Sequence, residues 1–267
     1  MSDVLARIVE RTRARLAGEP SDDGDLRRAA RDAARSRKEH AFSTALQSEG
    51  VNIIAEIKSA SPSAGPIIEN PDVERIAADY REGGAAAISV VTEPEFFRGS
   101  RHWLRRASGA AGLPVIMKDF VVEPSQILAG VAAGADAMLL IASLLDADTL
   151  RRFIGILAEH GCDALVEVHD EADLERALAG GARLIGVNNR DLRTFRVDLG
   201  TSERLGALIP EDVIKVAESG ISSANDVQRM RAARFDAFLV GESLLRQNDR
   251  AAAVRRLRGA PPTGRPE

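Results

Sequence analysis

The stretch GADAMLLIASLLDADTLRRFIGILAEHGCDALVEV, residues 134–168, contains one complete strand–helix–strand repeat of the pattern that decides the fold. An apolar run at 137–141 is followed by a segment with helical spacing at 147–159, then by Gly161 and a second apolar run at 164–168. Continuous apolar strands separated by amphipathic helices are typical of a parallel sheet covered by helices. Glycine after a helix favours the left-handed cap that leads into the next strand.

The same unit recurs along most of the chain. Helical spacing occurs at 73–82, 127–133, 147–159, 171–179 and 224–233, between apolar runs at 53–57, 87–91, 115–117, 137–141, 164–168, 184–187, 213–217 and 237–240. Eight strand–helix units in one chain predict an α/β fold of the (β/α)8 (TIM) barrel type. The alternative is a doubly wound open sheet, which usually carries a Gly-rich fingerprint after its first strand, and none is present.

The flanks of the repeats differ from the barrel pattern. Residues 1–48 hold two stretches of helical spacing, broken at 18–24, and predict an N-terminal helical extension that packs on the barrel. We assign residues 49–258 to the catalytic barrel. The last segment, 259–267, contains three prolines and is expected to be a frayed tail.

Composition narrows the class of partner. A chain of 267 residues with 45% hydrophobic content can bury the core of one large domain. The 36 basic and 40 acidic residues are mixed, so no basic field exists for nucleic acid or an anionic membrane. Aromatic residues make up only 4%, which disfavours base stacking, and no apolar run is long enough to span a membrane. An anionic small molecule must therefore be held by a local site.

Cysteine and histidine usage gives the remaining expectations. Cys162 is the only cysteine, and the first residues do not form a signal peptide, so we expect a reducing cytoplasmic location. The histidines, His40, His102, His160 and His169, show no paired zinc-ligand spacing, so we expect no metal. The sequence does not define an oligomeric state, and a monomer is the default expectation.

Candidate chemistry lies where apolar strands end in polar residues, because barrel active sites occupy the carboxyl ends of the strands. Glu56 and Lys58 are two residues apart and point to the same side of the first strand. Lys118 ends the third strand, where partial desolvation would lower its pKa and suit it to general acid catalysis. The structural alternatives are a buried ion pair for the first two residues and a snorkelling surface side chain for Lys118.

Later strands add further groups. Glu167 interrupts the fifth apolar run and is a natural proton acceptor, while Asn188 and Arg190 follow the sixth strand as hydrogen-bond donors, although a plain turn would also explain them. Gly220 and Gly241 follow the seventh and eighth strands, where this fold usually binds phosphate through backbone N–H groups and a helix N-terminus.

These residues lie within segments that resemble indole-3-glycerol phosphate synthases. The resemblance covers about residues 42–246, and its motifs occur in the family's order. The matching segments are IIAEIKSASPSAG at 53–65, ISVVTEPEFFRGS at 88–100, MKDF at 117–120, GADAMLLI at 134–141, LVEVHDEADLERAL at 165–178, IGVNNRDLRTFRVDL at 185–199, ESGI at 218–221 and LVGESLL at 239–245.

The resemblance implies a reaction without a metal or organic cofactor. Its substrate is 1-(2-carboxyphenylamino)-1-deoxyribulose 5-phosphate, whose ring closure, decarboxylation and dehydration give indole-3-glycerol phosphate. By its place in the motif, Lys118 corresponds to the general acid of ring closure and Glu167 to the group that handles the dehydration proton. Lys58 is similar to the residue that holds anionic parts of the substrate, with Glu56 and Asn188 as its polar partners.

The resemblance also implies a binding surface around these groups. Glu218 corresponds to a further active-site carboxylate, and Glu242 is expected to contribute only backbone, with its side chain turned away from the phosphate. The other implied positions hold the anionic groups or wall the aromatic ring, and they are Ser61, Ser219, Gly220 and Gly241 for the anions and Phe97, Phe120 and Leu239 for the ring. As a cationic donor after the sixth strand, Arg190 is also expected to bind the substrate or its phosphate.

The sequence departs from the family pattern at three positions. Ser59 and Ala64 stand where lysine is frequent, and Met117 replaces a frequent arginine. By strand alternation, Met117 is expected to point away from the side of Lys118. Two other functions stay open: a phosphate-binding barrel isomerase such as a phosphoribosyl-anthranilate isomerase, which would call for a Cys and Asp pair, and a non-catalytic barrel that binds a phosphorylated metabolite.

Overall fold

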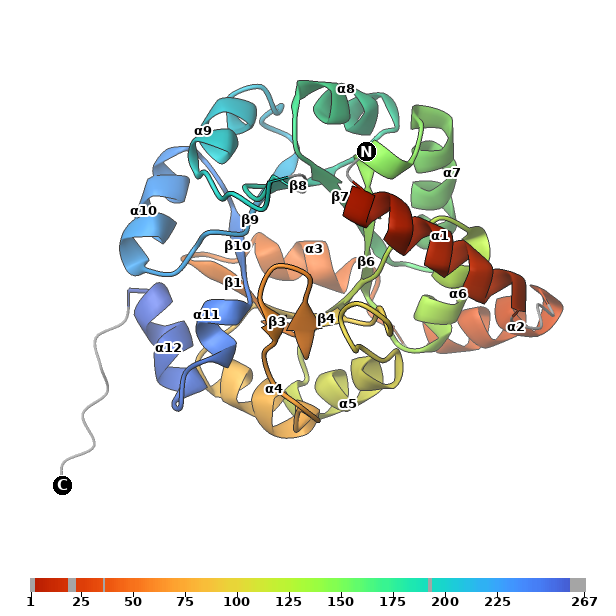
Figure 1. Cartoon of the computed structure of the whole chain (residues 1–267), viewed down its shortest axis with the longest axis horizontal. Helices are drawn as coiled ribbons and strands as arrows, with labels where there is room; N and C mark the ends of the chain where they lie inside the picture. The colour runs from red at the N-terminus through yellow and green to blue at the C-terminus, as the bar shows by residue number, and fades with distance from the viewer. Residues whose placement is uncertain (1–2, 19–22, 36, 192–193, 260–267) are drawn as a thin grey trace.

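The computed structural model describes residues 3–18, 23–35, 37–191 and 194–259. Its centre is a closed barrel of eight parallel strands, in which β1 pairs with both β4 and β10 (Figure 1). The predicted (β/α)8 barrel is therefore confirmed. The barrel strands are β1 (Asn52–Ile57), β4 (Ala87–Val91), β5 (Val115–Lys118), β6 (Ala137–Ile141), β7 (Asp163–Val168), β8 (Leu184–Asn188), β9 (Ile214–Glu218) and β10 (Ala237–Val240).

Helices surround the barrel, and further helices precede its first strand in the chain. The short hairpin of β2 (Ala60–Ser61) and β3 (Gly65–Pro66) follows β1, and a 3-10 turn spans Ala142–Leu144. None of the described helices is long and apolar enough to cross a membrane. The helices are α1 (Asp3–Gly18), α2 (Asp23–Ala34), α3 (Ala41–Leu46), α4 (Val73–Glu82), α5 (His102–Ala111), α6 (Pro124–Ala132), α7 (Ala147–Ala158), α8 (Glu171–Ala179), α9 (Gly200–Gly206), α10 (Ala224–Ala232), α11 (Glu242–Leu245) and α12 (Arg250–Leu257).

Local capping explains where several barrel helices begin. The side chain of Asp72 accepts a backbone N–H at the start of α4, and Asp146 and Asp170 do the same for α7 and α8. Ser223 starts α10 within a capping box. Such caps satisfy backbone donors that the helix cannot pair internally, so they fix the point at which each strand-to-helix loop ends.

The apolar core has two layers, as the alternation of side chains along the strands requires. The outer layer lies between strands and helices, and Met117 belongs to it, packed against Gly130 of α6. Met117 therefore points away from Lys118, as expected. The inner layer fills the barrel itself with the buried side chains of Phe42, Leu46, Ile54, Ala87, Ile116, Ala137, Leu139, Ile141, Leu165, Leu184, Val216, Ala237 and Leu239.

Two N-terminal helices lie at opposite ends of this barrel. Figure 1 shows α1 on the near face and α3 behind the strands. Phe42 and Leu46 of α3 are fully buried in the inner layer, so α3 closes the end of the barrel at which the strands begin. The opposite end, where the strands finish, is left for a cavity.

Most predicted elements agree with the structure to within a few residues. The helix expected at 127–133 begins earlier, at Pro124, because Glu123 and Gln126 form a capping box before it. Helices α3, α5, α9, α11 and α12 and the β2–β3 hairpin were not among the expected elements. The expected break at 18–24 and the expected tail at 259–267 fall largely outside the described residues.

We predict that Phe42→Ala destabilises the barrel without touching its mouth. Phe42 is fully buried, so truncation leaves a cavity and should lower the free energy of unfolding by roughly 3–5 kcal/mol. Leu208→Ala is the control, because Leu208 is 52% exposed and should change stability by no more than about 0.5 kcal/mol. Urea unfolding followed by circular dichroism measures both. Equal stability of the two variants would contradict the role given to α3.

Candidate active site

A cavity of about 620 Å³ opens at the mouth formed by the carboxyl ends of the strands. The sequence-predicted residues gather there, with one exception, Glu218, which is fully buried behind the cavity wall and contacts Lys118. Those that line the cavity are Glu56, Lys58, Ser61, Phe97, Lys118, Phe120, Glu167, Asn188, Arg190, Ser219, Gly220, Leu239, Gly241 and Glu242.

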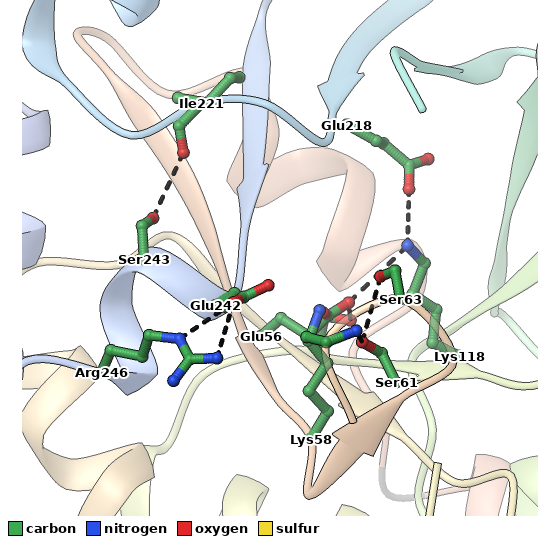
Figure 2. A network of polar contacts seen from close by, with 12 residues as sticks. Glu56, Lys58, Ser61, Ser63, Lys118, Glu218, Ile221, Glu242, Ser243 and Arg246 are labelled. Carbon is green, nitrogen blue, oxygen red and sulfur yellow. Dashed lines mark hydrogen bonds and ion pairs between the residues drawn. The ribbon is translucent and has the colours of Figure 1, made fainter. Parts of the chain in front are cut away.

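The ammonium group of Lys118 lies at the centre of the site. Its Nζ donates a hydrogen bond to Glu218 Oε2 at 2.8 Å and lies 3.7 Å from Glu56 Oε2 and 3.8 Å from Glu167 Oε2. These four residues come from β5, β9, β1 and β7, so the closed barrel brings them together. Figure 2 shows the lysine between Glu218 and Glu56.

Charge controls the protonation of this cluster. Burial alone would lower the pKa of Lys118, but the three surrounding carboxylates outweigh burial and raise it above its ordinary value. The sequence-based expectation of a lowered pKa was therefore wrong, since it took account of desolvation and not of the carboxylates. Burial also acts to raise the pKa of Glu56, yet Lys58 and Lys118 together hold it below its usual value.

Burial opposes the ionisation of the carboxyl group of Glu218. Burial, together with the charges of Glu167 and Glu56, raises its pKa to about 7, and Lys118 offsets this only in part. Its Oε1 has no hydrogen-bond partner in the described structure. That oxygen packs against Gly186 of β8, where any Cβ atom would collide with it. Glycine at 186 therefore makes room for the carboxyl group.

Glu56 and Lys58 form the second half of the cluster. Lys58 Nζ donates to Glu56 Oε1 at 2.7 Å, and Ser89 Oγ donates to Glu56 Oε2 at 3.4 Å. A Cβ atom at Gly241 would lie 2.5 Å from Glu56 Oε1. The absence of a side chain at Gly241 therefore accommodates Glu56, a reason that the sequence did not reveal when it suggested close approach of phosphate.

The loops after β8, β9 and β10 form one side of the mouth. Asn188 Oδ1 accepts the backbone N–H of Arg190, whose guanidinium donates to the carbonyl of Phe195. Ser219 and Gly220 both have positive φ angles, 63° and 82°, which turn the chain sharply after β9.

The loop after β10 leads at once into the short helix α11. Glu242 begins α11, and its carboxylate accepts a hydrogen bond from Arg246 Nε at 2.9 Å (Figure 2). Because the first N–H groups of a helix lack internal partners, α11 presents donors at the cavity. In the loop after β1, Ser61 Oγ in β2 accepts a hydrogen bond from the backbone N–H of Ala64, which holds the β2–β3 hairpin closed.

An apolar wall completes the cavity. The rings of Phe97 and Phe120 have centroids 6.0 Å apart and planes inclined by 40°. Sequence reasoning missed the contribution of α1, whose Val4, Leu5 and Ile8 line the same cavity. The apolar stripe of α1 was visible in the sequence, but a stripe alone indicates packing and not a binding surface.

Two further expectations concern metal and cysteine. No group of three or more His, Cys, Asp or Glu residues within the described ranges is arranged to hold a metal ion. Cys162 lies directly before β7, at the start of that strand, where its buried sulfur contacts the guanidinium of Arg37. Burial raises the pKa of Cys162 to about 11, which makes a poor nucleophile.

The closed barrel, with lysines held among carboxylates at its mouth, defines a (β/α)8-barrel enzyme built for proton transfer on a small anionic molecule. The sequence model of the family described as indole-3-glycerol phosphate synthase matches residues 5–257. The chain therefore belongs to the indole-3-glycerol phosphate synthase family.

Individual relatives agree with this assignment. An indole-3-glycerol phosphate synthase of Ruminiclostridium cellulolyticum is 46% identical over 220 residues, covering 82% of this chain and 85% of the relative. Another, of Desulfosudis oleivorans, is 43% identical over 264 residues and covers 96% of this chain and 99% of the relative. A thiamine phosphate pyrophosphorylase of Pyrococcus furiosus shares only the fold, with a TM-score of 0.58, 16% identity and coverage of 78% of this chain and 94% of that one.

We predict that Gly186→Ala inactivates the site while the barrel stays folded. The new methyl group would displace the carboxyl group of Glu218 and its hydrogen bond to Lys118. Turnover should fall by roughly 10²-fold or more, the usual worth of one acid–base group. Gly155→Ala in α7 is the matched control, because a Cβ there meets no atom within 4 Å. Steady-state kinetics measures turnover, and circular dichroism shows whether each variant is folded. Unchanged turnover in Gly186→Ala would contradict the packing argument.

Proposed function

We propose that this site converts 1-(2-carboxyphenylamino)-1-deoxyribulose 5-phosphate into indole-3-glycerol phosphate, carbon dioxide and water. The observation that carries the proposal is the position of Lys118 among Glu56, Glu167 and Glu218 at the mouth of a family-matched barrel. The ring carbon that bears the carboxylate attacks the ketone carbon of the ribulose part. Loss of carbon dioxide and then of the former ketone oxygen as water completes the indole.

Lys118 serves as the general acid of ring closure. Attack on the ketone places negative charge on its oxygen, and an ammonium group within hydrogen-bond reach stabilises that charge and gives up a proton. An alkoxide is a stronger base than a lysine amine, so Lys118 can protonate it even though the surrounding carboxylates raise the pKa of Lys118. Glu218, whose pKa is about 7, can share the resulting change of charge.

Glu167 serves the later dehydration. Its Oε2 lies 3.8 Å from Lys118 Nζ, so both groups can reach the same carbon and its oxygen. Lys58 binds an anionic part of the substrate, and Glu56 orients Lys58 through their 2.7 Å hydrogen bond. Asn188 offers its amide at the opposite side of the cavity.

The substrate lies with its ring against the apolar wall and its phosphate at the loops. Phe97, Phe120 and Leu239 contact the aromatic ring, which must be folded close to the ketone before the bond can form. The phosphate oxygens accept hydrogen bonds from backbone N–H groups in the loop at Ser219 and Gly220 and in the first turn of α11.

Other residues at the mouth assist in holding the anions. Ser61, Arg190 and Gly241 border the same cavity. Glu242 contributes only its backbone, because its carboxylate is paired with Arg246. The loss of lysine at positions 59 and 64 reduces the positive charge near the hairpin, and Ser59 itself is buried.

The site disfavours the alternative functions. A phosphoribosyl-anthranilate isomerase would need a cysteine at a strand's carboxyl end, whereas Cys162 lies at the start of β7. A barrel that only binds a metabolite would gain nothing from three carboxylates buried around a lysine, since buried charges are costly to maintain. We further propose that the chain acts in the cytoplasm as a monomer, without nucleic acid or membrane partners, because its charges are mixed and its single cysteine suits a reducing compartment.

We predict that Glu167→Gln stops the reaction after ring closure. The wild-type chain, mixed with the anilino-ribulose phosphate, should develop indole absorbance and fluorescence. The variant keeps the size of the side chain but cannot exchange a proton, so indole formation should slow by roughly 10²–10⁴-fold. Single-turnover quenching should reveal a cyclised but undehydrated species. Accumulation of unreacted substrate alone would place Glu167 in ring closure and overturn the division of roles.

We predict that Ser243→Asp weakens phosphate binding. Ser243 lies in the first turn of α11 and borders the cavity, so an added carboxylate would repel the phosphate. The KM should rise about tenfold or more with a smaller change in kcat, and competitive inhibition by inorganic phosphate should weaken in parallel. Ser243→Ala is the control that removes the hydroxyl without adding charge. A phosphate inhibition constant that is the same in all three proteins would contradict this location.

A further inference from the structure

His169 is a buried titratable residue that the mechanism above does not use. It follows β7 directly and lies two positions after Glu167, on the same side of the chain by strand alternation. Its side chain is 15% exposed, and its Nε2 is buried without a hydrogen-bond partner in the described structure. That atom lies 3.3 Å from Glu167 Oε1. A buried polar atom therefore faces a catalytic carboxylate.

The other nitrogen of the ring faces a second carboxylate, Asp173. His169 Nδ1 lies 3.4 Å from Asp173 Oδ2, which also accepts the backbone N–H of His169 at 3.1 Å. Asp173 is held in place from several directions, because its backbone N–H donates to Asp170 Oδ1 and its Oδ1 accepts from Arg176. The first turn of α8 thus fixes the imidazole ring between two carboxylates.

This arrangement determines where the imidazole carries its protons. A proton on Nδ1 is favoured by Asp173, and a proton on Nε2 is favoured by Glu167, so the doubly protonated imidazolium suits both neighbours. In a neutral ring, one of the two nitrogens carries a lone pair instead of a proton. That lone pair would face a carboxylate oxygen and repel it, unless the oxygen is itself protonated. The charged groups that face the ring or its partners are Glu167 on β7, Asp173 and Arg176 on α8, Glu218 on β9 and Lys118 on β5.

We propose that His169 is a positioning residue for Glu167: its imidazolium holds the carboxylate of Glu167 turned so that Oε1 faces the ring and Oε2 faces Lys118 and the cavity. The inference rests on the proposed function, because it concerns the proton acceptor assigned there. The imidazolium Nε2 lies 3.3 Å from Glu167 Oε1 and attracts that oxygen. Contact at Oε1 leaves Oε2 available to the substrate.

The protonation of His169 supports the same conclusion. Burial alone would lower its pKa, but the contact with Asp173 and the charges of Glu167 and Glu218 raise it above its usual value. A group with a raised pKa keeps its charge to higher pH and loses it as the pH rises through that value. The hold on Glu167 is therefore complete in acid solution and weakens on the alkaline side.

The first test is the pH profile of His169→Gln, which keeps a polar side chain but cannot carry charge. Because the wild-type imidazole is charged in acid solution and loses that charge as the pH rises, kcat of the variant should fall about tenfold at pH 6 and much less at pH 8, with KM within about twofold. His160→Gln is the matched control, because His160 is half-buried just after α7 and its ring bonds to the carbonyl of Ile156. A fall by the same factor at every pH, or no fall, would overturn the proposal.

The second test does not depend on turnover. Nuclear magnetic resonance of the labelled imidazole gives the titration midpoint of His169 in the wild-type chain and in Glu167→Gln. Removal of the neighbouring charge should lower the midpoint by about one pH unit, and Asp173→Asn should lower it as well. An unchanged midpoint in Glu167→Gln would refute the coupling even if indole forms normally. A wild-type chain that forms no indole but shows the coupling would refute the proposed function instead.

Discussion

One ammonium group among three buried carboxylates is the constraint on which the rest of the site depends. Lys118 lies within 4 Å of Glu56, Glu167 and Glu218, and Lys58 supplies a further positive charge at hydrogen-bond distance from Glu56. Carboxylates at such spacing repel one another unless a cation lies between them. The four residues come from four different strands, so the charge balance exists only while the barrel is closed and its strands are in register.

Most of the fold could be predicted from the sequence. Barrel strands are buried on both sides, so each one appears in the sequence as an apolar run that can be recognised by itself. What it could not convey was the role of short elements. Helix α3 has only six residues, too few for an amphipathic period, and its importance comes from Phe42 entering the inner layer from outside the repeat. The β2–β3 hairpin is too short for any pattern of its own.

Residues of the site could be predicted from the sequence where a charged side chain interrupts an apolar strand. They could not be predicted where the site is lined by apolar side chains. Glu56 and Glu167 stand out because charge is rare within apolar runs. Leu5 and Ile8 resemble ordinary core residues, and only the path of α1 over the mouth makes them part of the cavity wall. The protonation of Lys118 was misjudged for a related reason: the carboxylates that raise its pKa lie far away in sequence.

Closure of the barrel between the first and last strands has a consequence for synthesis. Asn52 of β1 pairs with Ala237 of β10, so the ring of strands is completed by the final strand to leave the ribosome. Until then β1 presents an open edge on the side where β10 will pair, and Glu56 lacks the wall at Gly241 against which it packs. In a nascent chain the charged residues of the site therefore stay apart for most of translation. The site becomes active late and in a single step, when β10 closes the barrel.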